Sequence, residues 1–156
     1  MTPIETVTLR TYRPEDLDAM VALDARCFSV PFRFGHSAMR SFAEAANAWS
    51  YLAVSDGDVC GFCITHLEQA AYGSLGYLVT IDVSPEYRRR GVGELMLAAA
   101  EAWLSGTGAG MMLLHVFTEN TGAIRFYRNA GYRRVREESD FYGPGMHAAV
   151  YLKELD

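Results

Sequence analysis

Hydrophobic residues recur along the chain at two spacings, one typical of strands and one typical of helices. Runs rich in β-branched and aromatic residues predict strands at residues 7–10, 49–55, 59–67, 74–83, 111–117, 132–138 and 148–153. Apolar residues three and four apart predict helices at 14–27, 36–47 and 91–104, and a further helix that begins at Asn120 and is closed by Gly131. This order of elements predicts a mixed α/β domain.

Two turn signals mark where predicted strands end. Asp56-Gly57-Asp58 separates two strands, and an Asp-Gly pair in such a place is a strong hairpin signal. The strand at 74–83 is long, and its β-branched and aromatic content favours a central position in the sheet. It runs into Ser84-Pro85, which stops it because proline cannot donate to a strand ladder.

Composition limits the classes of protein that the chain can be. A length of 156 residues is that of one domain, so we expect a single domain over residues 1–156. Half of the residues are hydrophobic and 21% are charged, which is typical of folded chains. The net charge of -5 argues against a nucleic-acid partner, since phosphate contacts need a basic surface. The sequence has no signal peptide and no membrane-spanning run, so we expect a soluble protein without membrane partners.

The cysteines and most histidines carry no metal signature. Cys27, Cys60 and Cys63 are odd in number, which favours a reducing compartment and therefore the cytoplasm. Cys60 and Cys63 spell C-x-x-C inside a predicted strand, where residues three apart point to opposite faces, and no second cysteine pair completes a zinc site. We therefore expect no metal, and we assign no role to the remaining histidines, His36, His66 and His147.

The segment Tyr87 to Gly93, YRRRGVG, indicates an anion site. It links a strand to a helix, and a helix that begins after a glycine-bearing turn presents unpaired N–H groups and positive potential to phosphate. Arg88 to Arg90 add local positive charge. The letters do not match a P-loop, and the third glycine of a dinucleotide fingerprint would fall at Met96. Taken alone, the segment is equally compatible with a solvated arginine surface.

Arg88-x-x-Gly91-x-Gly93 resembles the pyrophosphate-binding signature of the GCN5-related N-acetyltransferase family, and the predicted element order is that family's order over nearly the whole chain. The resemblance implies one acyltransferase domain with a central mixed, mostly antiparallel sheet flanked by helices, and acetyl-CoA as cosubstrate. It implies that main-chain groups of Ile81, Asp82 and Val83 pair with pantetheine. It also implies a pyrophosphate loop made of Arg88, Arg89, Arg90, Gly91, Val92, Gly93 and Glu94.

A second family motif is Asn120-x-x-Ala123-x-x-x-Tyr127. Asn120 and Tyr127 are two helical turns apart, so they share a face. The resemblance implies that Asn120 and Ala123 contact the cofactor, and that Tyr127 reaches the thioester sulfur and donates a hydrogen bond to the departing thiolate. From the residues alone, Asn120 is also a helix N-cap and Tyr127 a core aromatic.

Acetyl transfer to an amine needs a base, and the resemblance implies His115 together with Tyr77. Related bacterial ribosomal-protein alanine acetyltransferases carry glutamate at that position of the strand. The stretch Leu114 to Tyr132 is instead similar to the E-type N-terminal acetyltransferases of eukaryotes, which have histidine there and a tyrosine on the central strand. In those enzymes the pair relays the amine proton through water. A lone histidine in the strand MMLLHVF is otherwise typical of a core residue.

The resemblance favours the N-terminal α-amine of a protein or peptide as acceptor, acetylated by direct transfer in a ternary complex. At neutral pH, forming the neutral amine costs roughly 3 kcal/mol less for an α-amine than for a lysine side chain. Small amines such as polyamines, amino acids or aminoglycosides are an alternative, and a non-catalytic acyl-CoA-binding subunit is a third. The sequence carries no signal of oligomeric state. The substrate residues implied by the family are Phe28, Val30, Pro31, Phe32 and Tyr142.

Two of those segments depart from the family pattern. The usual Phe-Pro is split by Ser29 and Val30, and the first residue of the usual tyrosine pair is Phe141. The missing hydroxyl at Phe141 removes a group that could hold peptide backbone. The preference for a first substrate residue is therefore open.

Overall fold

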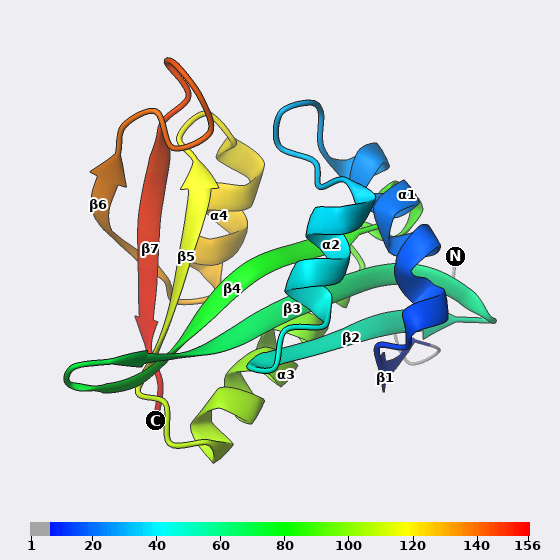
Figure 1. The fold of residues 1–156 in the computed structure, drawn as a ribbon, viewed down its shortest axis with the longest axis horizontal. Coiled ribbons are helices and arrows are strands. Elements are labelled where there is room, and N and C mark those ends of the chain that lie inside the picture. The colour runs from blue at the N-terminus through cyan, green and yellow to red at the C-terminus, as the bar shows by residue number, and fades with distance from the viewer. Residues whose placement is uncertain (1–6) are drawn as a thin grey trace. The chain divides into compact units, whose positions relative to one another are not determined.

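The computed structural model describes residues 7–156, which fall into two compact units. The first unit comprises residues 7–66 and Val79–Ala102, and the second comprises Leu67–Leu78 and Trp103–Asp156. The strands are hydrogen-bonded in the order β1-β2-β3-β4-β5-β7-β6 (Figure 1). The pairs β1–β2, β2–β3, β5–β7 and β6–β7 are antiparallel, whereas β4 and β5 are parallel. The mixed α/β class and the mostly antiparallel sheet predicted from the sequence are confirmed.

The elements follow the predicted order. Their bounds are β1 (Thr8–Thr11), η2 (Pro14–Asp16), α1 (Leu17–Cys27), α2 (His36–Ala43), β2 (Ala48–Ser55), β3 (Asp58–Ala70), β4 (Gly73–Val83), η3 (Pro85–Tyr87), α3 (Val92–Gly106), β5 (Met111–Phe117), α4 (Thr121–Asn129), β6 (Arg133–Glu138) and β7 (Ala148–Glu154). Three predicted boundaries were wrong by three residues or more. The strand expected to end at Leu67 runs to Ala70, and α1 begins at Leu17 after a 3-10 turn. The helix expected to reach Asn47 ends at Ala43. Because β2 starts at Ala48, the intervening residues are needed for the turn between helix and strand.

The hairpin between β2 and β3 has the predicted turn. Ser55 pairs with Asp58, so Asp56 and Gly57 form the loop. Their φ angles are 51° and 81°, as a type I′ turn requires at both central positions. Glycine adopts such an angle without strain, and aspartate tolerates it better than most residues do.

The first unit packs helices against the β2–β3 hairpin. Leu52, Phe62 and Ile64 pack against buried side chains of α1 and α2, among them Met20 and Met39. Figure 1 shows these two helices beside β2 and β3. Successive side chains of a strand point to opposite faces, so Tyr51 points away from Leu52. Its buried hydroxyl donates a hydrogen bond to the backbone carbonyl of Met96 in α3. The unit therefore buries both faces of the hairpin.

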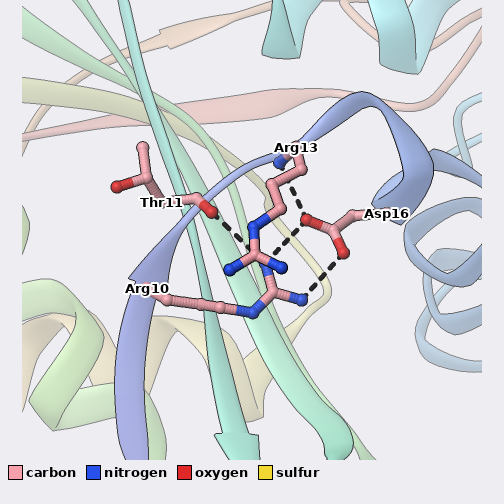
Figure 2. A network of polar contacts seen from close by, with 4 residues as sticks. All are labelled: Arg10, Thr11, Arg13 and Asp16. Atoms are coloured by element: carbon pink, nitrogen blue, oxygen red, sulfur yellow. Dashed lines mark hydrogen bonds and ion pairs between the residues drawn. The ribbon is translucent and has the colours of Figure 1, made fainter.

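An ion pair fastens the start of α1 to the first strand. Figure 2 shows the Arg10 guanidinium binding both carboxylate oxygens of Asp16 at 2.8 Å, while the Arg13 backbone N–H donates to the same carboxylate. The hydrogen bond from Arg10 lowers the pKa of Asp16. Two parallel N–H···O bonds of this kind are directional as well as strong, so they fix the angle at which the chain enters the helix.

In the second unit β5 lies between β4 and β7, and β6 pairs with the far side of β7. Gly76 of β4 faces Leu104 of α3, and a Cβ built at that glycine would lie 2.2 Å from a Leu104 methyl carbon. Only glycine allows this approach of helix and strand. Tyr77, the next residue, points to the opposite face of the sheet. Within residues 7–156, no helix is both long enough and apolar enough to cross a bilayer.

We expect Gly76→Ala to lower the free energy of unfolding by about 1–3 kcal/mol, because the added methyl overlaps a fully buried leucine and forces helix and strand apart. Urea unfolding followed by circular dichroism measures the loss. The matched control is Gly106→Ala, since the space around a Cβ at Gly106 is open. Equal stability of Gly76→Ala and the unchanged chain would contradict this packing.

Candidate active site

Tyr77 and His115 meet on one face of the parallel strand pair. Tyr77 pairs with Leu113 across β4 and β5, and His115 lies two residues beyond Leu113 on the same face of β5. The Tyr77 hydroxyl oxygen is 2.8 Å from Nδ1 of His115. The two residues that the sequence analysis proposed as a proton relay are thus in direct hydrogen-bond contact.

A third residue, Glu138, completes a chain of hydrogen bonds. Its Oε2 lies 2.6 Å from Nε2 of His115, and Arg136 binds the same oxygen at 3.3 Å. His115 and Arg136 both pair with Val150 of β7, so Glu138, two residues after Arg136, lies on the same face as the imidazole. Glu138 was not predicted from the sequence. Its contact with His115 reaches across β7, and the pairing register of that strand cannot be derived from the sequence.

The loop between β6 and β7 covers the imidazole with an aromatic ring. Phe141 stacks on His115 with ring centroids 4.0 Å apart and planes 7° from parallel. The loop is held by its own hydrogen bonds, from Gly145 N–H to the Asp140 carboxylate at 2.7 Å and from Asp140 N–H to His147 Nδ1 at 3.0 Å. The position at which the family pattern has a tyrosine here supplies an apolar cover for the His115 ring.

Tyr142, a predicted substrate residue, lies beside this cover. Its ring meets the Phe141 ring edge-on, with centroids 4.9 Å apart, and also contacts Phe117 at the end of β5. Burial raises the pKa of its hydroxyl, and the nearby Tyr77 raises it further. Its role in binding substrate stays a prediction.

The protonation states of Tyr77 and Glu138, the two partners of His115, follow from their surroundings. Burial raises the pKa of Tyr77 to about 12, with a smaller contribution from the Glu138 charge, so this hydroxyl keeps its proton at neutral pH. The hydrogen bond from His115 lowers the pKa of Glu138 below its ordinary value, and Arg136 adds to the effect. Glu138 is therefore a carboxylate at neutral pH and accepts hydrogen bonds.

The second predicted motif lies on α4. Asn120 is the N-cap of this helix, and its side-chain oxygen accepts a hydrogen bond from Ala123 N–H at 3.2 Å. Tyr127 is 8% exposed and contacts the rings of Phe126 and Tyr132. Asn120 therefore caps the helix and Tyr127 is a packed aromatic residue, as the residues alone predicted. The cofactor and thiolate roles predicted for Asn120, Ala123 and Tyr127 remain predictions.

The predicted pyrophosphate loop lies in the first unit, after β4 and η3. Gly91 and Arg89 have φ angles of 84° and 62°, so the chain makes a left-handed turn before the helix. The first hydrogen bond inside α3 runs from Leu95 N–H to the Gly91 carbonyl at 2.9 Å. The amides of Val92, Gly93 and Glu94 therefore precede the helical ladder and point out of the helix N-terminus, as anion binding requires.

The three arginines of the loop differ in their contacts. Arg88 Nε donates to the Val83 carbonyl at the end of β4, at 3.2 Å, which ties the loop to the strand predicted to hold pantetheine. The Arg90 guanidinium lies over the Tyr87 ring, 5.3 Å from its centroid. Both contacts leave the charge of the guanidinium near the turn.

Asp82, predicted to offer only its main chain, has a buried side chain beside the carboxyl of Asp24 from α1, and each residue is 1% exposed. One oxygen of Asp82 accepts from Thr80 and one oxygen of Asp24 accepts from Phe34 N–H, both at 2.6 Å. The other two oxygens have no donor among the described residues. Burial, and then Asp24, raise the pKa of Asp82 well above its ordinary value.

Four further predicted substrate residues, Phe28, Val30, Pro31 and Phe32, follow α1 in the first unit. The segment forms a turn, with Phe32 N–H donating to the Ser29 carbonyl at 2.8 Å. Val30 is 73% exposed at its tip. The predicted site residues are thus divided between the units, with the Tyr77–His115–Glu138 chain, Tyr142 and the α4 motif in the second. No group of three metal-ligating side chains occurs among the residues that the structure describes.

The sequence model of the acetyltransferase (GNAT) family matches residues 17–132. A mycothiol acetyltransferase of Thermobispora bispora is 31% identical over 140 residues, which cover 83% of this chain and 48% of that protein. Among solved structures, the ribosomal-protein-S18-alanine N-acetyltransferase of Escherichia coli is 20% identical with a TM-score of 0.83, covering 96% of this chain and 94% of that one. NAA60 of Arabidopsis thaliana in complex with acetyl-CoA is 22% identical with a TM-score of 0.83, covering 96% and 98%.

The chain belongs to the acetyltransferase (GNAT) family. Membership confirms the predicted family, whereas acetyl transfer from acetyl-CoA by this chain belongs to the proposal below. The solved structures confirm the fold. The chain spans about half the length of the mycothiol acetyltransferase that it matches.

We expect Asp82→Asn to stabilise the protein at alkaline pH. Because the pKa of Asp82 is raised on folding, its stability contribution is present below the unfolded pKa and is lost as pH rises through the folded pKa. Asparagine removes the charge and can donate to Asp24. At pH 8 the free energy of unfolding should exceed that of the unchanged chain by about 1–3 kcal/mol, and the difference should vanish toward pH 4.

Urea unfolding at several pH values tests this, with Asp58→Asn as the control because Asp58 is exposed at the start of β3. A lower stability of Asp82→Asn than of the unchanged chain at pH 8 would contradict the reading of this pair.

Proposed function

We propose that the protein transfers acetyl from acetyl-CoA to the N-terminal α-amine of a protein or peptide, by direct transfer in a ternary complex. The observation that carries the proposal is the 2.8 Å contact between a protonated, half-buried Tyr77 and Nδ1 of His115. Such a pair can take a proton from an amine that attacks a thioester. Family membership supports the acetyl donor, and the proposal concerns the acceptor and the residues that act.

Each step of the reaction has a candidate group. The neutral amine attacks the thioester carbonyl, so a C–N bond forms and the carbonyl oxygen becomes an oxyanion. The amine then loses a proton to the Tyr77 oxygen, directly or through one water, while the Tyr77 proton passes to Nδ1 of His115. Collapse of the intermediate breaks the C–S bond, and the thiolate receives a hydrogen bond from Tyr127. His115 returns its proton to solvent after product leaves.

Two arguments favour an α-amine over a lysine side chain. The α-amine has a pKa near 8 and lysine near 10.4, so a weak neutral base can accept the proton of an α-amine with less cost. The fold is shared with a ribosomal-protein-S18-alanine N-acetyltransferase, whose name refers to an alanine acceptor. In the second unit, the loop that carries Phe141 and Tyr142 is proposed to contact the peptide. The substrate contact of the exposed turn at Val30, in the first unit, stays a prediction.

A small-molecule amine is the second candidate. It is favoured by the relative at 31% identity, which is named a mycothiol acetyltransferase. The substitution of Phe141 for the usual tyrosine also favours it, because Phe141 contributes an apolar ring and no hydrogen bond to peptide backbone.

We expect His115→Ala and Tyr77→Phe each to lower kcat by about 100-fold or more, since the base or its link to the amine is removed, while coenzyme A affinity stays within about twofold. Steady-state kinetics and calorimetry with acetyl-CoA measure the two effects. His36→Ala is the control, because His36 is exposed on α2 and pairs with Asp18. Undiminished turnover in both variants would remove these residues from the mechanism.

The acceptor is identified by offering acetyl-CoA with a library of short peptides that differ at the first residue, beside a panel of polyamines, amino acids, thiols bearing amines and aminoglycosides. Mass spectrometry then reports which nitrogen is modified. We expect acetylation of peptide α-amines and none of internal lysines. Activity on the small amines alone would favour the second candidate, and binding of acetyl-CoA without any turnover would indicate a non-catalytic subunit.

A further inference from the structure

We propose that Glu138 is a positioning residue of the acetyl-transfer reaction, which fixes the proton of His115 on Nε2 and leaves Nδ1 as the basic atom that faces Tyr77. The inference rests on the proposed function and deepens it, because it names the atom that accepts the proton and the residue that selects this atom. It follows from the hydrogen bonds on the two sides of one imidazole ring.

The protonation of the ring is determined by its neighbours. Glu138 is a carboxylate, and a carboxylate only accepts hydrogen bonds, so the 2.6 Å contact requires a proton on Nε2 of His115. A neutral imidazole then has a lone pair on Nδ1. Tyr77 keeps its proton and lies 2.8 Å from Nδ1, so its hydroxyl donates into that lone pair. All three groups are satisfied by this arrangement, whereas a proton on Nδ1 in place of Nε2 would leave two acceptors, Nε2 and the Glu138 carboxylate, in contact.

Glu138 also stabilises the ring once it has taken a proton. The His115 side chain is 12% exposed and the Glu138 side chain 37% exposed, and Phe141 covers the ring face at 4.0 Å. An imidazolium formed in this partly buried site is stabilised by the negative charge of the carboxylate that already contacts Nε2. Among the described residues, the titratable and charged groups around the ring are Tyr77 from β4 and Glu138 with Arg136 from β6. Tyr142, in the loop after β6, lies against Phe141 and near Tyr77.

An irregularity in β6 selects this glutamate over its neighbour. Arg134 pairs with Tyr151 and Arg136 with Val150, so Val135 is an extra residue on β6. Without this bulge every later side chain of β6 would change face, and Glu137 would occupy the face of His115. Instead Glu137 forms an ion pair with Arg134 at 2.6 Å. The two adjacent glutamates therefore differ in environment, which makes Glu137 a matched control.

The kinetic test compares Glu138→Gln and Glu138→Ala with Glu137→Gln in the full chain, using the acceptor found in the peptide and amine assay. We expect kcat to fall about 10- to 100-fold in both Glu138 variants. The acid limb of the pH profile of kcat/KM should move to lower pH, because the imidazolium loses its counter-ion. Glu137→Gln should leave both unchanged. A merely structural role for Glu138 would lower activity without moving the limb, and that result would overturn the proposal.

A second measurement needs no substrate. The ¹⁵N chemical shifts of the His115 ring, assigned by their loss in His115→Gln, report which nitrogen carries the proton at pH 8. We expect the proton on Nε2 in the unchanged chain and a mixture of both forms in Glu138→Ala. A proton on Nδ1 in the unchanged chain, or the same distribution in Glu138→Ala, would overturn the proposal. If no acceptor is acetylated, the proposed function fails while this measurement still decides the ring's proton.

Discussion

The arrangement of the reactive groups depends on the hydrogen-bond register of four strands. The parallel pairing of Tyr77 with Leu113 brings Tyr77 and His115 to one face, and the register of β7 carries that face on to β6. A shift of one residue in any of these pairings would turn Tyr77, His115 or Glu138 to the other side of the sheet. The backbone ladder, more than any contact between side chains, therefore determines that tyrosine, imidazole and carboxylate meet.

The pKa values of two carboxyl groups in this protein are shifted in opposite directions by their surroundings. Glu138 is partly exposed and contacts an imidazole and a guanidinium, which lower its pKa and keep it ionised. Asp82 is buried against Asp24, which raises its pKa and favours the acid form. An ionised Glu138 fixes the proton of its imidazole neighbour. The raised pKa of Asp82 favours the acid form, which makes it less costly for the carboxyl groups of Asp82 and Asp24 to lie together.

The sequence was sufficient to predict features that depend on residues close together along the chain. The Asp56-Gly57 turn, the N-cap at Asn120 and the glycine turn at Gly91 are set by residues close together in the chain, and the structure has each of them. The pairing of Tyr77 with His115 came from resemblance to a family, and here the structure adds the direct contact. That prediction depended on a motif, because no rule of spacing relates residues on different strands.

Other features could not be predicted, because they depend on the register of distant segments. Glu138 was missed because it reaches His115 across β7, and because a single extra residue at Val135 decides which glutamate does so. The contact of Asp24 with Asp82 joins a helix to a strand far along the chain. Phe141 was read as the loss of a hydroxyl, whereas its ring stacks on the imidazole.

The central claim is that two protons move together when the amine is acetylated, one to the Tyr77 oxygen and one from Tyr77 to His115. A proton inventory tests this most directly: kcat/KM for acetyl transfer is measured in mixtures of H₂O and D₂O, in the unchanged chain and in Tyr77→Phe. The account predicts a curved dependence on deuterium fraction in the unchanged chain and a straight line in the variant. A straight line in both would contradict the relay.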